Sequence, residues 1–234
     1  MFTTEEKTRI INITKGLSVV TIYFLFSIFS TLPLNLLHIN YDNLPLLIKE
    51  IYSFSTELIM LIIIFLIFKK QFKTAWQDLK KNHLNYFSKY FKFYILGIFL
   101  MISANALINI LGGQMSGNET AIRDQFSLAP IYTFCSAVFL APLLEETVFR
   151  LAFRNIFKNN FIFIVSSGLI FGSLHLLSGI SLQFLPLYLV SYCSFGFIFA
   201  YMLAKTNNIF VPIGFHTMHN GILMSLQVFL LLFS

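Results

Sequence analysis

Two adjacent carboxylates and a nearby arginine form the first group of residues in this chain that could do chemistry. Glu145 and Glu146 are neighbours, and Arg150 follows Glu146 by one helical turn, so Glu146 and Arg150 can pair. Glu145 points about 100° away around the helix and cannot share that partner equally. Carboxylates with unequal partners suit one as a general base and the other as a structural anion. On its own, the pattern fits a charged helix end at a membrane surface equally well.

Two further clusters supply imidazole and amide groups. His175 follows Phe171 by one helical turn in LIFGSLHLL, although a lone helical histidine is more often a hydrogen-bonded packing residue. His216 and Asn220 are one turn apart in VPIGFHTMHNGIL, so they share a face. Neither spacing is the zinc-protease pattern of two histidines flanking a glutamate on one helix. Any metal ion would need ligands from different helices.

The composition indicates that membrane helices carry these clusters. Of 234 residues, 57% are hydrophobic and only 11% are charged, whereas about a quarter of an average soluble domain is charged. The predicted fold class is therefore all-α: a polytopic transmembrane helical bundle forming a single membrane domain over residues 1–234. The net charge of +6 does not indicate a nucleic-acid partner, because the Lys and Arg residues fall in gaps between apolar runs.

Seven apolar runs are long enough, or nearly so, to cross a bilayer. They cover residues 17–39, 51–68, 93–112, 129–157, 161–177, 185–204 and 209–232, and an eighth span would require the last run to divide. With the N-terminus in the cytoplasm, fourteen of the sixteen Lys and Arg residues are cytoplasmic, which supports that orientation. Segment 69–92 places aromatic residues opposite lysines at helical spacing, which predicts an amphipathic helix on the cytoplasmic surface. A solvated basic loop is the alternative.

A shared site requires the three clusters to lie at similar depths in the membrane. At about 1.5 Å per residue, one continuous helix over 129–157 places Glu145 roughly 20 Å from its cytoplasmic end, near the depth of His175. A helix that stopped near Glu146 would leave the glutamates at the surface. We therefore expect a long helix that draws Arg150 into the membrane, paired with Glu146.

The three motifs together are more specific than any one of them. Glu-Glu-x-x-x-Arg, Phe-x-x-x-His and His-x-x-x-Asn, in this order on successive apolar segments, resemble the CPBP family of intramembrane proteases, also called the Abi or CAAX-protease domain family. The resemblance covers about residues 129–225, which would form the catalytic core. It implies a helical bundle whose active site lies inside the membrane, opens toward the cytoplasmic half and hydrolyses a peptide bond with an activated water.

The resemblance also implies a role for each motif residue. The catalytic set would be Glu145, Glu146, His175, His216 and Asn220, supported by Arg150 and Phe171. Glu145 would be the general base with His175 as its partner, while His216 and Asn220 would stabilise the oxyanion. A zinc ion bound by Glu145, His175 and His216 is chemically consistent with this set, and a metal-free glutamate mechanism fits the same residues.

The implied partners are the lipid bilayer and a hydrophobic or lipidated peptide, such as a CAAX-like tail, a leader or a signalling peptide. The residue composition is typical of a bacterial protein, which favours the bacterial cell membrane. Two other classes of function stay open. One is a non-catalytic bacteriocin self-immunity or scaffold protein of the same fold. The other is an ion- or proton-coupled transporter with a path through Glu57, Tyr188, Tyr192 and Tyr201, although the sequence shows no inverted repeat.

Overall fold

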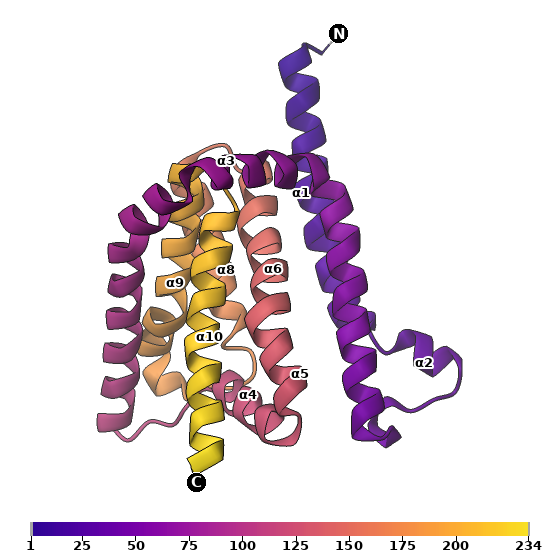
Figure 1. The fold of residues 1–234 in the computed structure, drawn as a ribbon, viewed down its shortest axis with the longest axis vertical. Helices are drawn as coiled ribbons and strands as arrows, with labels where there is room; N and C mark the ends of the chain where they lie inside the picture. Colours follow the sequence, from indigo (N-terminus) through magenta and orange to yellow (C-terminus); the bar gives the residue numbers. More distant parts are fainter. Residues whose placement is uncertain (1, 234) are drawn as a thin grey trace.

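A computed structural model describes residues 2–233, and all regular elements in this range are helices (Figure 1). Five helical stretches are long and apolar enough to cross a membrane, and a sixth apolar helix is shorter. The prediction of an all-α, multi-pass membrane bundle is therefore confirmed. In chain order the elements are α1 (Thr4–Phe29), α2 (Leu32–Leu36), η1 (Tyr41–Asn43), α3 (Leu46–Ile110), α4 (Gly117–Leu128), α5 (Pro130–Cys135), η2 (Ser136–Leu140), α6 (Ala141–Glu146), η3 (Thr147–Ala152), α7 (Phe153–Ile156), α8 (Asn160–Leu174), η4 (Leu182–Phe184), α9 (Leu185–Thr206) and α10 (Phe210–Phe233).

Helix α3 is a single arch of 65 residues. It rises beside α1, crosses one end of the bundle and descends beside α9 (Figure 1). The arch therefore contains two of the predicted spans together with the basic segment 69–92, called the crosspiece below. No break separates these three parts, so the alternative of a solvated loop for the crosspiece was wrong.

The aromatic face of the crosspiece was predicted to contact lipid. Part of this face packs against the bundle instead. Phe72 and Tyr90 are buried against protein, whereas Trp76 remains exposed. Asn208, in the short connection before α10, is fully buried and donates its amide to Ala75 O at 2.8 Å and Asp78 Oδ2 at 2.7 Å. Contact of the remaining face with the membrane surface stays a prediction.

The first predicted span has different bounds in the structure. Helix α1 begins thirteen residues before that run, because Thr3 and Glu6 form a capping box that satisfies its first N–H groups. It ends at Phe29, ten residues before the predicted end. Near its start, Arg9 donates to the backbone oxygens of Asn155 and Ile156 at 2.7 and 2.5 Å. Arg9 therefore binds α1 to the carboxyl end of the helix that carries the glutamates.

Small residues bring α8 and α9 into close contact. A Cβ atom on Gly196 would lie 2.7 Å from the carbonyl oxygen of Gly168, and one on Gly172 would lie 2.3 Å from Cys193 Sγ. No side chain fits at these distances, so these glycines allow the close approach of the two helices. This contact fixes the end of α8, where His175 lies.

Candidate active site

Both glutamates lie on one helical run, Pro130–Ile156, which π-helical segments interrupt on either side of α6. Pro142 has no N–H and cannot bond the carbonyl four residues earlier, which favours a wider turn in η2. Thr147 Oγ1 donates to the carbonyl four residues before it at 2.6 Å, an interaction that bends helices, at the start of η3. Such wide turns redirect side chains and are frequent at functional sites. The expected long helix is present.

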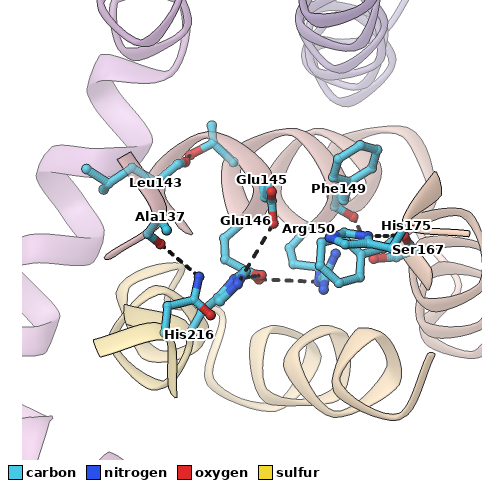
Figure 2. A network of polar contacts seen from close by, with 12 residues as sticks. Ala137, Leu143, Glu145, Glu146, Phe149, Arg150, Ser167, His175 and His216 are labelled. Atoms are coloured by element: carbon cyan, nitrogen blue, oxygen red, sulfur yellow. Dashed lines mark hydrogen bonds and ion pairs between the residues drawn. The ribbon is translucent and has the colours of Figure 1, made fainter. Parts of the chain in front are cut away.

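Glu146 is the centre of a buried polar network (Figure 2). Its side chain and that of Arg150 have no exposed surface, and Arg150 Nε lies 3.3 Å from Glu146 Oε2. His216 Nδ1 donates to Glu146 Oε1 at 2.9 Å. The guanidinium of Arg150 also lies 4.1 Å from the centre of the Phe171 ring. Both oxygens of Glu146 therefore face a cationic or hydrogen-bonding partner, which suits a structural anion.

Glu145 lies on a different side of the same helix and is partly open. Its side chain is 21% exposed, and Oε2 lies 3.8 Å from His216 Nε2. It lines a cavity of about 380 Å³ between α1, α3 and the α5–α6 part of the helical run Pro130–Ile156. Because His216 Nδ1 donates a hydrogen bond to Glu146, the other imidazole nitrogen, Nε2, is the one that faces Glu145. Glu145 is thus a carboxylate that water and substrate can reach, with an oriented imidazole beside it.

His175 occupies the position directly after α8 and has other partners than expected. Its Nδ1 donates to the carbonyl oxygen of Phe171 at 2.9 Å, and its ring stacks on Tyr192 with centroids 5.5 Å apart. No hydrogen bond or ion pair joins it to Glu145 within residues 2–233. The imidazole next to Glu145 is that of His216 instead, because α10 rather than α8 packs against this part of α6.

Asn220 links α10 to the first π segment. Its side-chain amide donates to Ala137 O at 2.8 Å, at the start of η2. One of the two amide hydrogens expected to reach an oxyanion is therefore already used. The second hydrogen remains for a substrate oxygen, since an amide nitrogen carries two.

The proposed zinc ligands do not form a metal site in this structure. Among the described residues, no group of three or more His, Cys, Asp or Glu side chains is arranged to hold a metal ion. His216 directs one nitrogen at each glutamate, and His175 uses Nδ1 on a backbone carbonyl. The set Glu145, His175 and His216 is therefore not assembled as a ligand shell.

The cavity at Glu145 depends on residues that the motifs did not identify. Glu57 of α3 is half-buried in its wall, where its oxygens accept from Tyr132 Oη at 3.1 Å and Ser136 Oγ at 2.7 Å. The rest of the wall comes mainly from the end of α1 and the start of α3, away from the crosspiece (Figure 1). In the predicted orientation, in which the crosspiece is cytoplasmic, this wall lies in the opposite half of the bundle from the opening that the resemblance implies. That orientation stays a prediction. The only sequence signal for this wall was an intramembrane glutamate, Glu57.

The three tyrosines of the transporter alternative do not extend this cavity into a longer polar path. Tyr188 donates to the backbone oxygen of Gln114 at 2.5 Å, and Tyr192 shares a hydrogen bond with Ser116. Tyr201 packs on aromatic rings of α3. None of the three is among the residues that line the cavity, so the structure does not support a path from Glu145 through them.

Comparisons with known proteins agree with the motif-based interpretation. Residues 127–222 match the family described as type II CAAX prenyl endopeptidase Rce1-like. A Bacillus subtilis (strain 168) protein with the name "Putative membrane peptidase YdiL" is 34% identical over 119 residues, which is 50% of this chain. The match covers 45% of that relative, so the chain spans about half the length of the curated relative it matches. No solved structure matches this chain significantly.

Proposed function

Because its C-terminal half belongs to the CPBP family of intramembrane proteases, we propose that this multi-pass membrane protein is an intramembrane endopeptidase for a hydrophobic or lipidated peptide. The observation that carries the proposal is that the two glutamates have different environments. Glu146 is buried and bound on both oxygens, whereas Glu145 opens on a cavity and faces His216. This is the arrangement that a general base for water requires.

In the proposed reaction, Glu145 removes a proton from a water molecule in the cavity. The water oxygen attacks the carbonyl carbon of the scissile peptide bond, and the carbon–nitrogen bond then breaks. Glu145 returns the proton to the departing amine nitrogen. The gap of 3.8 Å between Glu145 Oε2 and His216 Nε2 is too long for a direct hydrogen bond, which leaves both groups free to bind reacting oxygens.

His216 is proposed to stabilise the negative charge that develops on the carbonyl oxygen. Glu146 accepts from Nδ1 and so fixes the orientation of the imidazole, and a proton on Nε2 would be donated in a hydrogen bond to the carbonyl oxygen. The free amide hydrogen of Asn220 would be a second donor to this oxygen. His175 is proposed to position Phe171, and through it the Arg150–Glu146 pair, because its ring lies 4.5 Å from the Phe171 ring.

The test uses the purified protein in detergent with a library of fluorogenic hydrophobic and prenylated peptides. We expect Glu145→Gln to lower kcat/KM by about 10²–10⁴-fold, the usual contribution of a general base. Glu119→Gln is the matched control, because Glu119 is an exposed glutamate that pairs only at the protein surface. A chelator arm reports separately on metal dependence.

Equal cleavage by the wild type and Glu145→Gln would refute the proposed role of Glu145. Absence of cleavage by the wild type across the library would instead favour the immunity or scaffold alternative. In that case, the same variants should retain full protective activity in cells.

A further inference from the structure

The cavity beside Glu145 has an unusual charge for a site that receives a peptide. Two of its lining residues, Glu57 and Glu145, are carboxylates, and none of the described residues that line it is Lys, Arg or His. The remaining polar lining consists of hydroxyl groups from Ser, Thr and Tyr residues. A cavity with this lining disfavours an anion and favours a cation, because charges interact strongly where water is scarce.

Glu57 is held as a fixed acceptor in this wall. Tyr132 and Ser136 each donate to a different oxygen of its carboxylate, at 3.1 and 2.7 Å. An ionised carboxylate has about four acceptor positions, so about two of them stay open to a ligand. Both donors lie on the helical run that carries Glu145, so Glu57 and the proposed base are positioned by the same element.

The outer part of the cavity wall is also tied together by hydrogen bonds. Tyr41 and Ser53 share one of 2.9 Å, and Tyr52 donates to Ser30 O at 2.5 Å. These contacts join the α1–α3 connection to the first leg of the arch, so hydrogen bonds within the protein order this part of the wall. A wall that is already ordered loses little entropy when a ligand binds.

We propose that this cavity is a specificity subsite for an ammonium group of the substrate, with Glu57 as its ionic partner. The group is either the free N-terminal amine of a peptide or a lysine side chain near the scissile bond. A free C-terminal carboxylate, as in a CAAX tail, is disfavoured in this cavity by the two glutamates. The inference rests on the proposed peptidase function for its link to cleavage, but the preference for a cation can be measured by binding alone.

The test compares matched hydrophobic peptides that differ in a single charge. One pair carries lysine or its neutral analogue norleucine, and another has a free or an acetylated N-terminus, so the two sources of ammonium are separated. Binding is measured on the purified full-length protein by fluorescence anisotropy, and cleavage is measured in parallel. We expect the wild type to bind at least one cationic peptide roughly tenfold more tightly than its neutral partner.

Glu57→Gln should abolish this ratio, because the amide keeps an acceptor oxygen for Tyr132 or Ser136 but loses the charge. Glu57→Asp keeps the charge and should preserve the direction of the preference, which separates charge from folding. Glu119→Gln is the control and should leave the ratio unchanged. A ratio near one in the wild type, or an unchanged ratio in Glu57→Gln, overturns the subsite. Preferential binding without cleavage supports the subsite and counts against the proposed function.

Discussion

Replacement of Arg150 by methionine should be among the most damaging single substitutions outside the proposed reacting groups. Glu146 and Arg150 have no exposed side-chain surface, so the change leaves a carboxylate buried without its cation. Removal of one partner of a buried ion pair costs about 3–5 kcal/mol. Part of that loss comes from the contact with the Phe171 ring at 4.1 Å, since a desolvated cation–π contact contributes about 2 kcal/mol. For a chain of this length the loss corresponds to a fall in Tm of roughly 6–20 °C.

The assay is thermal unfolding in detergent, with Arg123→Met as the matched control. Arg123 makes the same i,i+4 contact with Glu119, but both side chains are about half exposed, so its loss should cost less than about 1 kcal/mol. None of the Arg150 nitrogens makes a well-aligned hydrogen bond to the described residues. The double variant Glu146→Gln/Arg150→Met should therefore be more stable than Arg150→Met by about 2 kcal/mol. Equal unfolding temperatures for Arg150→Met and Arg123→Met would refute this reasoning.

Three further predictions concern packing, anchoring and activity. Gly196→Ala should destabilise the protein by about 1–3 kcal/mol in thermal unfolding, because its Cβ would meet the Gly168 carbonyl at 2.7 Å; Gly221→Ala, whose nearest neighbour lies at 3.7 Å, should be tolerated. Arg9→Ala removes two hydrogen bonds to carbonyls at the end of α7 and should cost about 1–3 kcal/mol, with faster limited proteolysis near the N-terminus. Asn220→Ala should lower kcat by roughly 10²-fold if its free amide hydrogen binds the oxyanion, and a change only in Tm would limit Asn220 to its contact with η2.

The membrane fold and the contact between Glu146 and Arg150 follow from local patterns. Apolar runs of sufficient length dictate helices in lipid, because every backbone group must be bonded within the segment. The spacing of four between Glu146 and Arg150 brings their side chains together on any regular helix. Both properties are contained in a short stretch of sequence, so they could be predicted from residue spacing alone.

The partners of the imidazoles could not be predicted in the same way. Whether His175 or His216 lies beside Glu145 depends on which helix packs against α6, and neither local motif contains that information. The contribution of Glu57 depends on the path of α3, which continues through the basic segment as one helix. Helix propensity of residues 69–92 was visible in the sequence, whereas the packing that bends the arch over the bundle involves Asn208, more than a hundred residues away.

The π segment η2 has a consequence for how the two carboxylates of the cavity are aligned. Each π turn holds one more residue than an α turn, and each residue in an α-helix adds about 100° of rotation. Tyr132 and Ser136 bind Glu57 at or before η2, while Glu145 follows it, so the length of this segment sets their rotational phase. Because a π turn closes with one more residue than an α turn, loss of one residue within η2 would restore a regular helix and keep the Glu57 contacts in phase with Glu145, whereas the same loss from an adjoining α turn would rotate them apart by about 100°. In this part of the chain, the number of residues governs the geometry as directly as their identity does.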